Sequence, residues 1–174
     1  MAIREILRMG DRRLQQVAEP VSRVPDVLID RLLVDMFDTM ADAEGVGLAA
    51  PQIGESLRLV VFGFDQNDRY PQELSVPKTV LINPQIEVVD STEEADWEGC
   101  LSVPGMHGLV SRPVSIRYRG VDEFGETIDR TVSGFHARVV LHECDHLDGV
   151  LYPQRIRDLT DFGFEDLVGD DPAD

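Results

Sequence analysis

The sequence predicts an α+β fold, in which a helix precedes a group of antiparallel strands and a second helix follows them. Three observations support this prediction. Apolar residues recur at helical spacing early in the chain, β-rich runs separated by turn residues fill the middle, and a second helical segment lies near the end. Helix, strands and helix in separate blocks are typical of α+β folds rather than of alternating α/β folds.

The first long element is an amphipathic helix over residues 26–43, after a short helical stretch over residues 11–18. Acidic residues and Arg31 occupy one face of the long helix, and an apolar stripe occupies the other. We expect this stripe to face the core; it consists of Leu28, Ile29, Leu32, Leu33, Met36, Phe37 and Met40.

The middle of the chain alternates apolar runs with Gly, Pro and Asn, which is typical of strands and turns. Residues 110–121 and 126–132 have the pattern of a hairpin around Glu123-Phe124-Gly125. A second helix is expected over residues 135–147, and a short one is possible over 161–168. The other expected strands are residues 57–64, 78–82 and 85–89, the last two separated by Asn83-Pro84.

Length and charge limit the possible functions. The 174 residues favour one domain over residues 1–168, followed by an acidic tail at 169–174. The 33 acidic residues outnumber the 16 basic ones, and a net charge of −17 disfavours nucleic-acid and anionic-membrane partners. The chain has no apolar run of membrane-spanning length and no signal-peptide pattern, so we expect a cytoplasmic protein with reduced thiols.

The segment His142-Glu143-Cys144-Asp145-His146 matches the pattern HExxH. On a helix, His142 and His146 lie one turn apart on one face and can bind one metal ion, while Glu143 lies close enough to handle a proton. A catalytic site also needs a third protein ligand. No histidine follows His146, so two candidates remain open at this point: Glu165, 19 residues downstream, and Cys100. Cys144 points away from the metal face, and we expect it to pack in the core.

A glycine-rich segment, GVGLAAPQIG at residues 45–54, adds a third feature. It lacks the Lys-Ser/Thr of a phosphate-binding loop. Small residues allow the backbone to approach a ligand closely, and the Gln52 amide can donate to a reacting oxygen. A turn followed by a packed Ala-Ala stretch explains the same residues equally well.

Taken in order, GVGLAAPQ (45–52), EGCLS (98–102) and HECDH (142–146) resemble the three motifs of the peptide deformylase family. The resemblance extends from about residue 5 to residue 165. It implies antiparallel β-sheets packed around a central helix that carries HExxH. It also implies one divalent metal bound by Cys100, His142 and His146, most often Fe(II), with Zn, Ni or Co as substitutes. Leu141 departs from the family, since many members have Gln before the first His, and so does the acidic tail.

The activity that the resemblance implies is hydrolysis of the N-formyl group from the starting methionine of new polypeptides, with release of formate. Its partners are N-formylmethionyl nascent peptides, with transient ribosome contact. Glu143 is expected to act as general base and then general acid, and the Gln52 amide and Leu101 N–H to stabilise the oxyanion. The substrate-binding residues expected by resemblance are Gly45, Val46, Gly47, His107 and Val139.

The resemblance further implies that Arg112 pairs with Glu98 and braces the Cys100 loop. His136 is expected to be exposed at the N-terminus of the second helix. Two rival functions remain: an HExxH endopeptidase with Glu165 as third ligand, and a protein that binds formylated peptides without turnover. The intact Glu143 disfavours the second, because a pure binder does not need that carboxylate.

Overall fold

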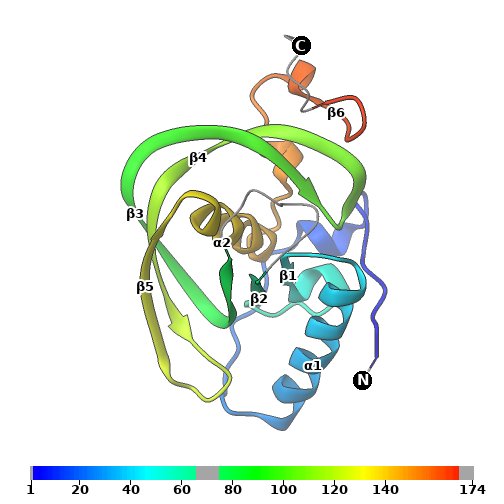
Figure 1. The fold of residues 1–174 in the computed structure, drawn as a ribbon. Helices are drawn as coiled ribbons and strands as arrows, with labels where there is room; N and C mark the ends of the chain where they lie inside the picture. Colours follow the sequence, from blue (N-terminus) through cyan, green and yellow to red (C-terminus); the bar gives the residue numbers. More distant parts are fainter. Residues whose placement is uncertain (1, 66–74, 169–174) are drawn as a thin grey trace.

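The structure, a computed structural model, describes residues 2–65 and 75–168 (Figure 1). Within them, six strands form one antiparallel sheet in the order β1-β2-β3-β4-β5, and β6 pairs with β4. Two α-helices, α1 (Val27–Asp42) and α2 (Gly134–Leu147), pack against this sheet. The strands are β1 (Gly47–Ala49), β2 (Leu59–Phe64), β3 (Val76–Cys100), β4 (Val103–Val121), β5 (Thr127–Ser133) and β6 (Phe162–Phe164).

The longest strands, β3 and β4, form a curved hairpin around α2 (Figure 1). The prediction of separate strands on either side of Asn83-Pro84 was wrong, because β3 continues through both residues. Asn83 adopts a positive φ of 52°, and the register with β4 shifts between Ile82 and Gln85. These turn residues therefore produce a bulge that bends the strand. As a result the expected sheets are joined into a single one.

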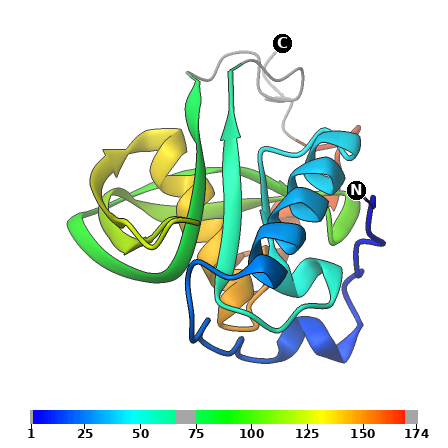
Figure 2. The same cartoon turned by 90° about the horizontal axis from the view of Figure 1, so that it is seen from below.

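Strand β2 explains how the two helices are positioned, because it is covered on both faces (Figure 2). Val60 and Phe62 belong to the apolar cluster that includes residues of α2, whereas Leu59 and Val61 belong to the cluster built on α1. Successive side chains of a strand point to opposite faces, so a strand between two helices is a continuous apolar run. This is the run that the sequence shows at residues 59–62.

Helix α1 lies where the periodicity predicts it. Asp26 caps its N-terminus by accepting a hydrogen bond from the Leu28 N–H at 2.8 Å. The apolar stripe is buried except at two positions: Phe37 is half-buried, and Leu28 is exposed like its neighbour Val27. The core prediction for Leu28 was wrong, because this residue of the first turn is 67% exposed.

The N-terminal stretch is shorter than predicted, since only Arg12–Gln15 form a 3₁₀ turn. The predicted helix over 161–168 is also wrong: Leu159–Asp161 form another 3₁₀ turn and β6 follows. Phe162 packs against Tyr152, and this tertiary contact together with pairing to β4 overrides a weak helical pattern. The acidic tail at 169–174 lies outside the described residues. No described helix has the length and apolar content that a membrane crossing requires.

Candidate metal centre

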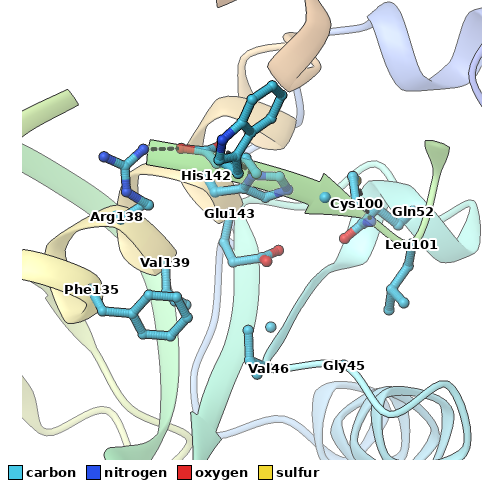
Figure 3. Close-up of a pocket in the computed structure, with 14 residues that line it drawn as sticks. Gly45, Val46, Gln52, Cys100, Leu101, Phe135, Arg138, Val139, His142 and Glu143 are labelled. Carbon is cyan, nitrogen blue, oxygen red and sulfur yellow. Dashed lines mark hydrogen bonds and ion pairs between the residues drawn. The ribbon is translucent and has the colours of Figure 1, made fainter. Parts of the chain in front are cut away.

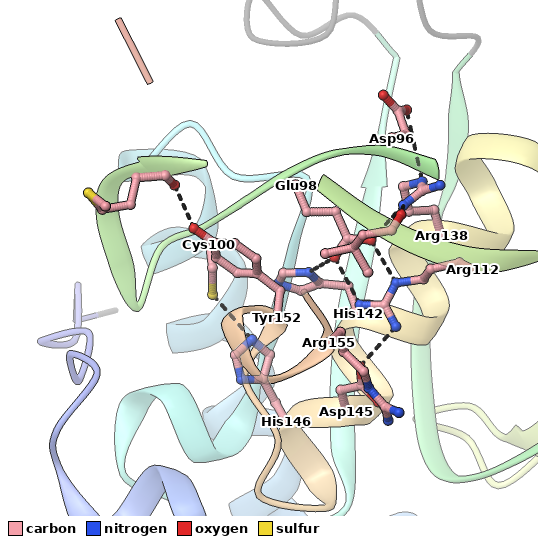
Figure 4. A network of polar contacts seen from close by, with 12 residues as sticks. Asp96, Glu98, Cys100, Arg112, Arg138, His142, Asp145, His146, Tyr152 and Arg155 are labelled. Atoms are coloured by element: carbon pink, nitrogen blue, oxygen red, sulfur yellow. Dashed lines mark hydrogen bonds and ion pairs between the residues drawn. The ribbon is translucent and has the colours of Figure 1, made fainter. Parts of the chain in front are cut away.

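Three side chains from two distant stretches of the chain meet at one point. Cys100 ends β3, while His142 and His146 lie one turn apart on α2 (Figure 4). Their ligand atoms all lie within 4.8 Å of one another, and Cys100 Sγ is 3.3 Å from His146 Nε2. Cys100 and His146 are buried, and the His142 side chain is 12% exposed. Sulfur and two imidazole nitrogens at this separation suit a divalent transition metal.

Glu98 holds the first of these imidazoles. His142 Nδ1 lies 2.9 Å from Glu98 Oε2, and the arginine Arg112 donates from Nε and Nη2 to both Glu98 oxygens at 2.6 and 2.8 Å. Burial opposes ionisation of Glu98, but the hydrogen bonds from Arg112 and His142 outweigh it and hold its pKa well below the usual range. An ionised Glu98 accepts from His142 Nδ1–H, which leaves the Nε2 lone pair for a metal.

The same arginine reaches a second carboxylate. Arg112 Nη1 donates to Asp145 at 2.8 Å, and Arg155 Nη2 donates to the other Asp145 oxygen at 2.6 Å (Figure 4). The Arg112 side chain is only 6% exposed. The predicted Glu98–Arg112 contact is therefore present, and it belongs to a larger buried network that also ties the helix residue Asp145 to β4. Asp145 was not assigned a role from the sequence.

Replacing Arg112 with alanine should destabilise the protein and loosen metal binding. The change leaves two buried carboxylates without their shared cation, which typically costs about 3–5 kcal/mol of unfolding free energy. Loss of an outer partner of a metal ligand typically weakens metal affinity by about 10–100-fold. Urea unfolding and metal titration measure the two effects. Arg117→Ala is the matched control, because Arg117 pairs with Asp129 at the surface. Equal behaviour of the two variants would contradict the bracing role.

Glu143 lies beside the three ligand atoms without joining them. It is buried, and its Oε2 has no hydrogen-bond partner in the part of the chain that the structure describes. Burial raises the pKa of Glu143 to about 7, a value suited to proton transfer near neutral pH. Its carboxylate faces Gly47: a Cβ at that position would lie 2.3 Å from Glu143 Oε1. Glycine at 47 is thus required by close approach.

Gln52 is held in one orientation by its neighbours. Its Oε1 accepts from the Ala49 N–H at 2.8 Å, so its Nε2 is directed toward Ser102 Oγ at 3.2 Å and Cys100 Sγ at 3.6 Å. The side chain is buried. This arrangement places an amide donor next to the sulfur of the candidate metal centre.

A pocket opens onto this group of residues (Figure 3). Of the residues predicted for the site, it is lined by Gly45, Val46, Gly47, Gln52, Cys100, Leu101, Val139, His142 and Glu143. Four lining residues were missed: Trp97, Gly99, Phe135 and Arg138. The signal for two of them was present, because Phe135 and Arg138 precede His142 by seven and four residues and so share its face of α2.

Two other candidates lie elsewhere. His107 does not line this pocket; its Nε2 is 3.8 Å from Glu165 Oε2. Glu165, the alternative third ligand, is therefore not part of the group formed by Cys100 and the two imidazoles among the described residues.

Comparison with known proteins then decides the family. Residues 3–162 match the family described as polypeptide deformylase. The chain belongs to the peptide deformylase family. Peptide deformylases are metal-dependent enzymes that hydrolyse the N-formyl group of nascent peptides (EC 3.5.1.88), and this is the activity of the chain.

Peptide deformylases from several bacteria align with almost the whole length of this chain. Peptide deformylase 2 of Ralstonia nicotianae and peptide deformylase 1 of Bordetella pertussis are each 58% identical over 166 residues, covering 95% of this chain and 94% of theirs. A class I type b peptide deformylase from Acinetobacter baumannii, solved with Met-Ala-Ser bound, superposes with a TM-score of 0.86 at 34% identity. The match covers 89% of this chain and 99% of that one.

Two further residues of this deformylase had predicted positions. Cys144, on α2, is buried in the core as predicted, and burial raises the pKa of its thiol. Both cysteines are free. The prediction for His136 was wrong: its ring is half-buried against Phe62 and Tyr118, and burial lowers its pKa. The ring therefore packs against side chains of β2 and β4 rather than pointing into solvent.

Gly47→Ala should impair this deformylase much more than Gly45→Ala. The new methyl carbon at position 47 would lie 2.3 Å from Glu143 Oε1, so the carboxylate must move. Displacement of a reacting group by about 1 Å can cost about 100-fold in turnover. At Gly45 the nearest atom is the far end of the Leu101 side chain at 2.9 Å, which can rotate away. Formate release by both variants measures the difference. Turnover by Gly47→Ala equal to that by Gly45→Ala would contradict the close-approach argument.

Proposed function

We propose that this deformylase binds one divalent metal ion through Cys100 Sγ, His142 and His146, and that Fe(II) is the metal in the cell, with Zn, Ni or Co as substitutes. The convergence of these three side chains is the observation that carries the proposal. A thiolate and two neutral imidazoles leave net positive charge at the site. When bound, the metal supplies a Lewis acid that lowers the pKa of water and polarises the formyl group.

The residues of the chain divide the remaining work. Glu143 takes a proton from the attacking water and passes it to the nitrogen of the departing amine. Its buried carboxylate, with one oxygen unpartnered among the described residues, supports this role. The Gln52 Nε2 and the Leu101 N–H donate to the oxygen on which negative charge develops. The fixed orientation of the Gln52 amide supports its part, because a pre-oriented donor need not reorganise during the reaction.

The peptide binds in extended form along the 45–47 segment. Strand β1 is an edge strand that pairs only with β2 in the described sheet, so an added strand beside it continues the sheet. Gly45 and Gly47 supply backbone groups for this pairing, and Val46 and Val139 line the pocket for the methionine side chain. Phe135 and Arg138 extend its wall. A rim role for His107 stays a prediction.

We infer in addition that residues 1–168 act as one metallo-hydrolase domain in the bacterial cytoplasm, with transient ribosome contact. The support is the family activity: formylated nascent peptides emerge from ribosomes, so an enzyme that acts on them works beside the ribosome.

Formate release from formyl-Met-Ala-Ser tests the function. Protein purified and loaded with Fe(II) without oxygen should convert the peptide with about one metal ion per chain. Activity should decline in air and persist with Ni, because oxygen attacks Fe(II) and an accessible thiolate. An intact formyl peptide after incubation with fully loaded protein would refute the proposal.

A further inference from the structure

Arg138 is a buried cation in the wall of a pocket that receives an apolar side chain. It lies on α2 one turn before His142, and only 8% of it is exposed. Its place on the pocket wall, beside Val139 and Phe135, is visible in Figure 3. The general chemistry of the reaction does not need a cation at this position, so its role must be sought in what it contacts.

The guanidinium bridges the helix to both long strands. Its Nη1 donates to Glu98 Oε1 at 2.8 Å (Figure 4). The same Nη1 donates to the Val110 carbonyl oxygen and Nη2 donates to the Glu94 carbonyl oxygen, each at 2.8 Å. Glu94 and Glu98 belong to β3 and Val110 to β4. The side chain therefore crosses the groove between α2 and β3, held at its far end by three hydrogen bonds.

A second pocket lies on the other side of this crossing. The substrate pocket contacts Trp97 and Glu98 on β3, whereas the second contacts Glu94 and Asp96, earlier on the same strand. On α2 the second pocket reaches back to Gly134. Phe135 and Arg138 line both pockets. The two pockets thus follow one groove, and these two side chains separate them.

We propose that Arg138 closes the far end of the substrate pocket and sets the longest first side chain that this deformylase accepts. The inference rests on the proposed function. The Arg138 methylenes present an apolar surface to the substrate while the guanidinium is satisfied by the strands. Swinging the side chain aside would break its hydrogen bonds to the buried Glu98 carboxylate, to the buried Val110 carbonyl oxygen and to the part-buried Glu94 carbonyl oxygen. The wall therefore does not yield to a longer substrate.

The test compares formyl-Xaa-Ala-Ser peptides in which Xaa is methionine, norleucine or 2-aminooctanoate, which is longer than norleucine by two methylenes. For the unaltered protein, kcat/KM should fall at least about tenfold from norleucine to 2-aminooctanoate, given what one methylene is worth in a closed pocket. In Arg138→Ala the ratio of 2-aminooctanoate to norleucine should rise at least about tenfold. Arg138→Met, which restores most of the length without the hydrogen bonds that hold the wall, should give a ratio between that of the unaltered protein and that of Arg138→Ala.

Binding of the unformylated peptides, measured by calorimetry, should show the same change in preference without depending on turnover. Metal content is measured for every variant, and Arg138→Val replaces Arg138→Ala if the latter does not fold. Equal use of norleucine and 2-aminooctanoate by the unaltered protein overturns the inference even if no variant folds. An unchanged ratio in a folded, metal-loaded Arg138→Ala or Arg138→Val also overturns it. Failure of the unaltered protein to release formate from the methionine peptide refutes instead the proposed function.

Discussion

Cys100→Ser should lose the bound metal, and with it formate release, whereas Glu165→Ala should retain both. Cys100 Sγ lies within 4.8 Å of a ring nitrogen of each imidazole, so all three atoms can bind the same metal ion. A serine hydroxyl is a much poorer ligand than a thiolate because it stays protonated. Even an outer-shell change weakens metal affinity by about 10–100-fold, so loss of a direct ligand should cost more than about 100-fold. Metal analysis after dialysis against a chelator measures the loss.

Glu165→Ala serves as the matched control, because Glu165 was the alternative third ligand. Glu165 Oε2 lies 3.8 Å from His107 Nε2, and Glu165 is not part of the candidate metal-binding group formed by Cys100, His142 and His146. The endopeptidase alternative makes the opposite prediction, namely metal loss with Glu165→Ala and retention with Cys100→Ser. Observation of that pattern would contradict the proposed ligand set and the deformylation mechanism that depends on it.

Glu143→Gln should lower kcat about 10²–10⁴-fold while the metal stays bound, the range typical of a lost general base. Glutamine has nearly the same shape, but its amide cannot take up a proton. Glu143 is buried beside Gly47, and the other carboxylate of this pocket, Glu98, is held by Arg112, Arg138 and His142. Formate release at saturating formyl-Met-Ala-Ser, with metal content measured in parallel, gives the effect.

Glu126→Gln is the control for the charge change, because Glu126 lies exposed on the hairpin between β4 and β5. It should leave kcat unchanged. If Glu143→Gln turned over substrate at the rate of this control, proton transfer by Glu143 would be excluded. If it lost its metal, its role would be in binding rather than in proton transfer.

Elements with local signals were predicted well. The stripe of apolar residues placed α1 to within one residue, and the β4–β5 hairpin formed around the expected turn. The errors fall where distant partners decide. Asn83 and Pro84 have turn propensity, yet pairing with β2 and β4 keeps β3 continuous past them. Phe162 follows a weak helical pattern, yet β4 recruits it into a strand.

The same distinction between local and distant partners applies to the metal centre. The sequence alone identified His142, Glu143 and His146 as one functional group, because residues four positions apart on a helix lie on the same face. Residue types and spacing alone did not decide between Cys100 and Glu165 as the third metal ligand; the resemblance to the family motifs favoured Cys100. Only the tertiary structure brought Cys100 to the imidazoles across 46 residues, and only it revealed Arg138 between two pockets. Contacts of this range depend on how the β3–β4 hairpin curves around α2, which no local pattern encodes.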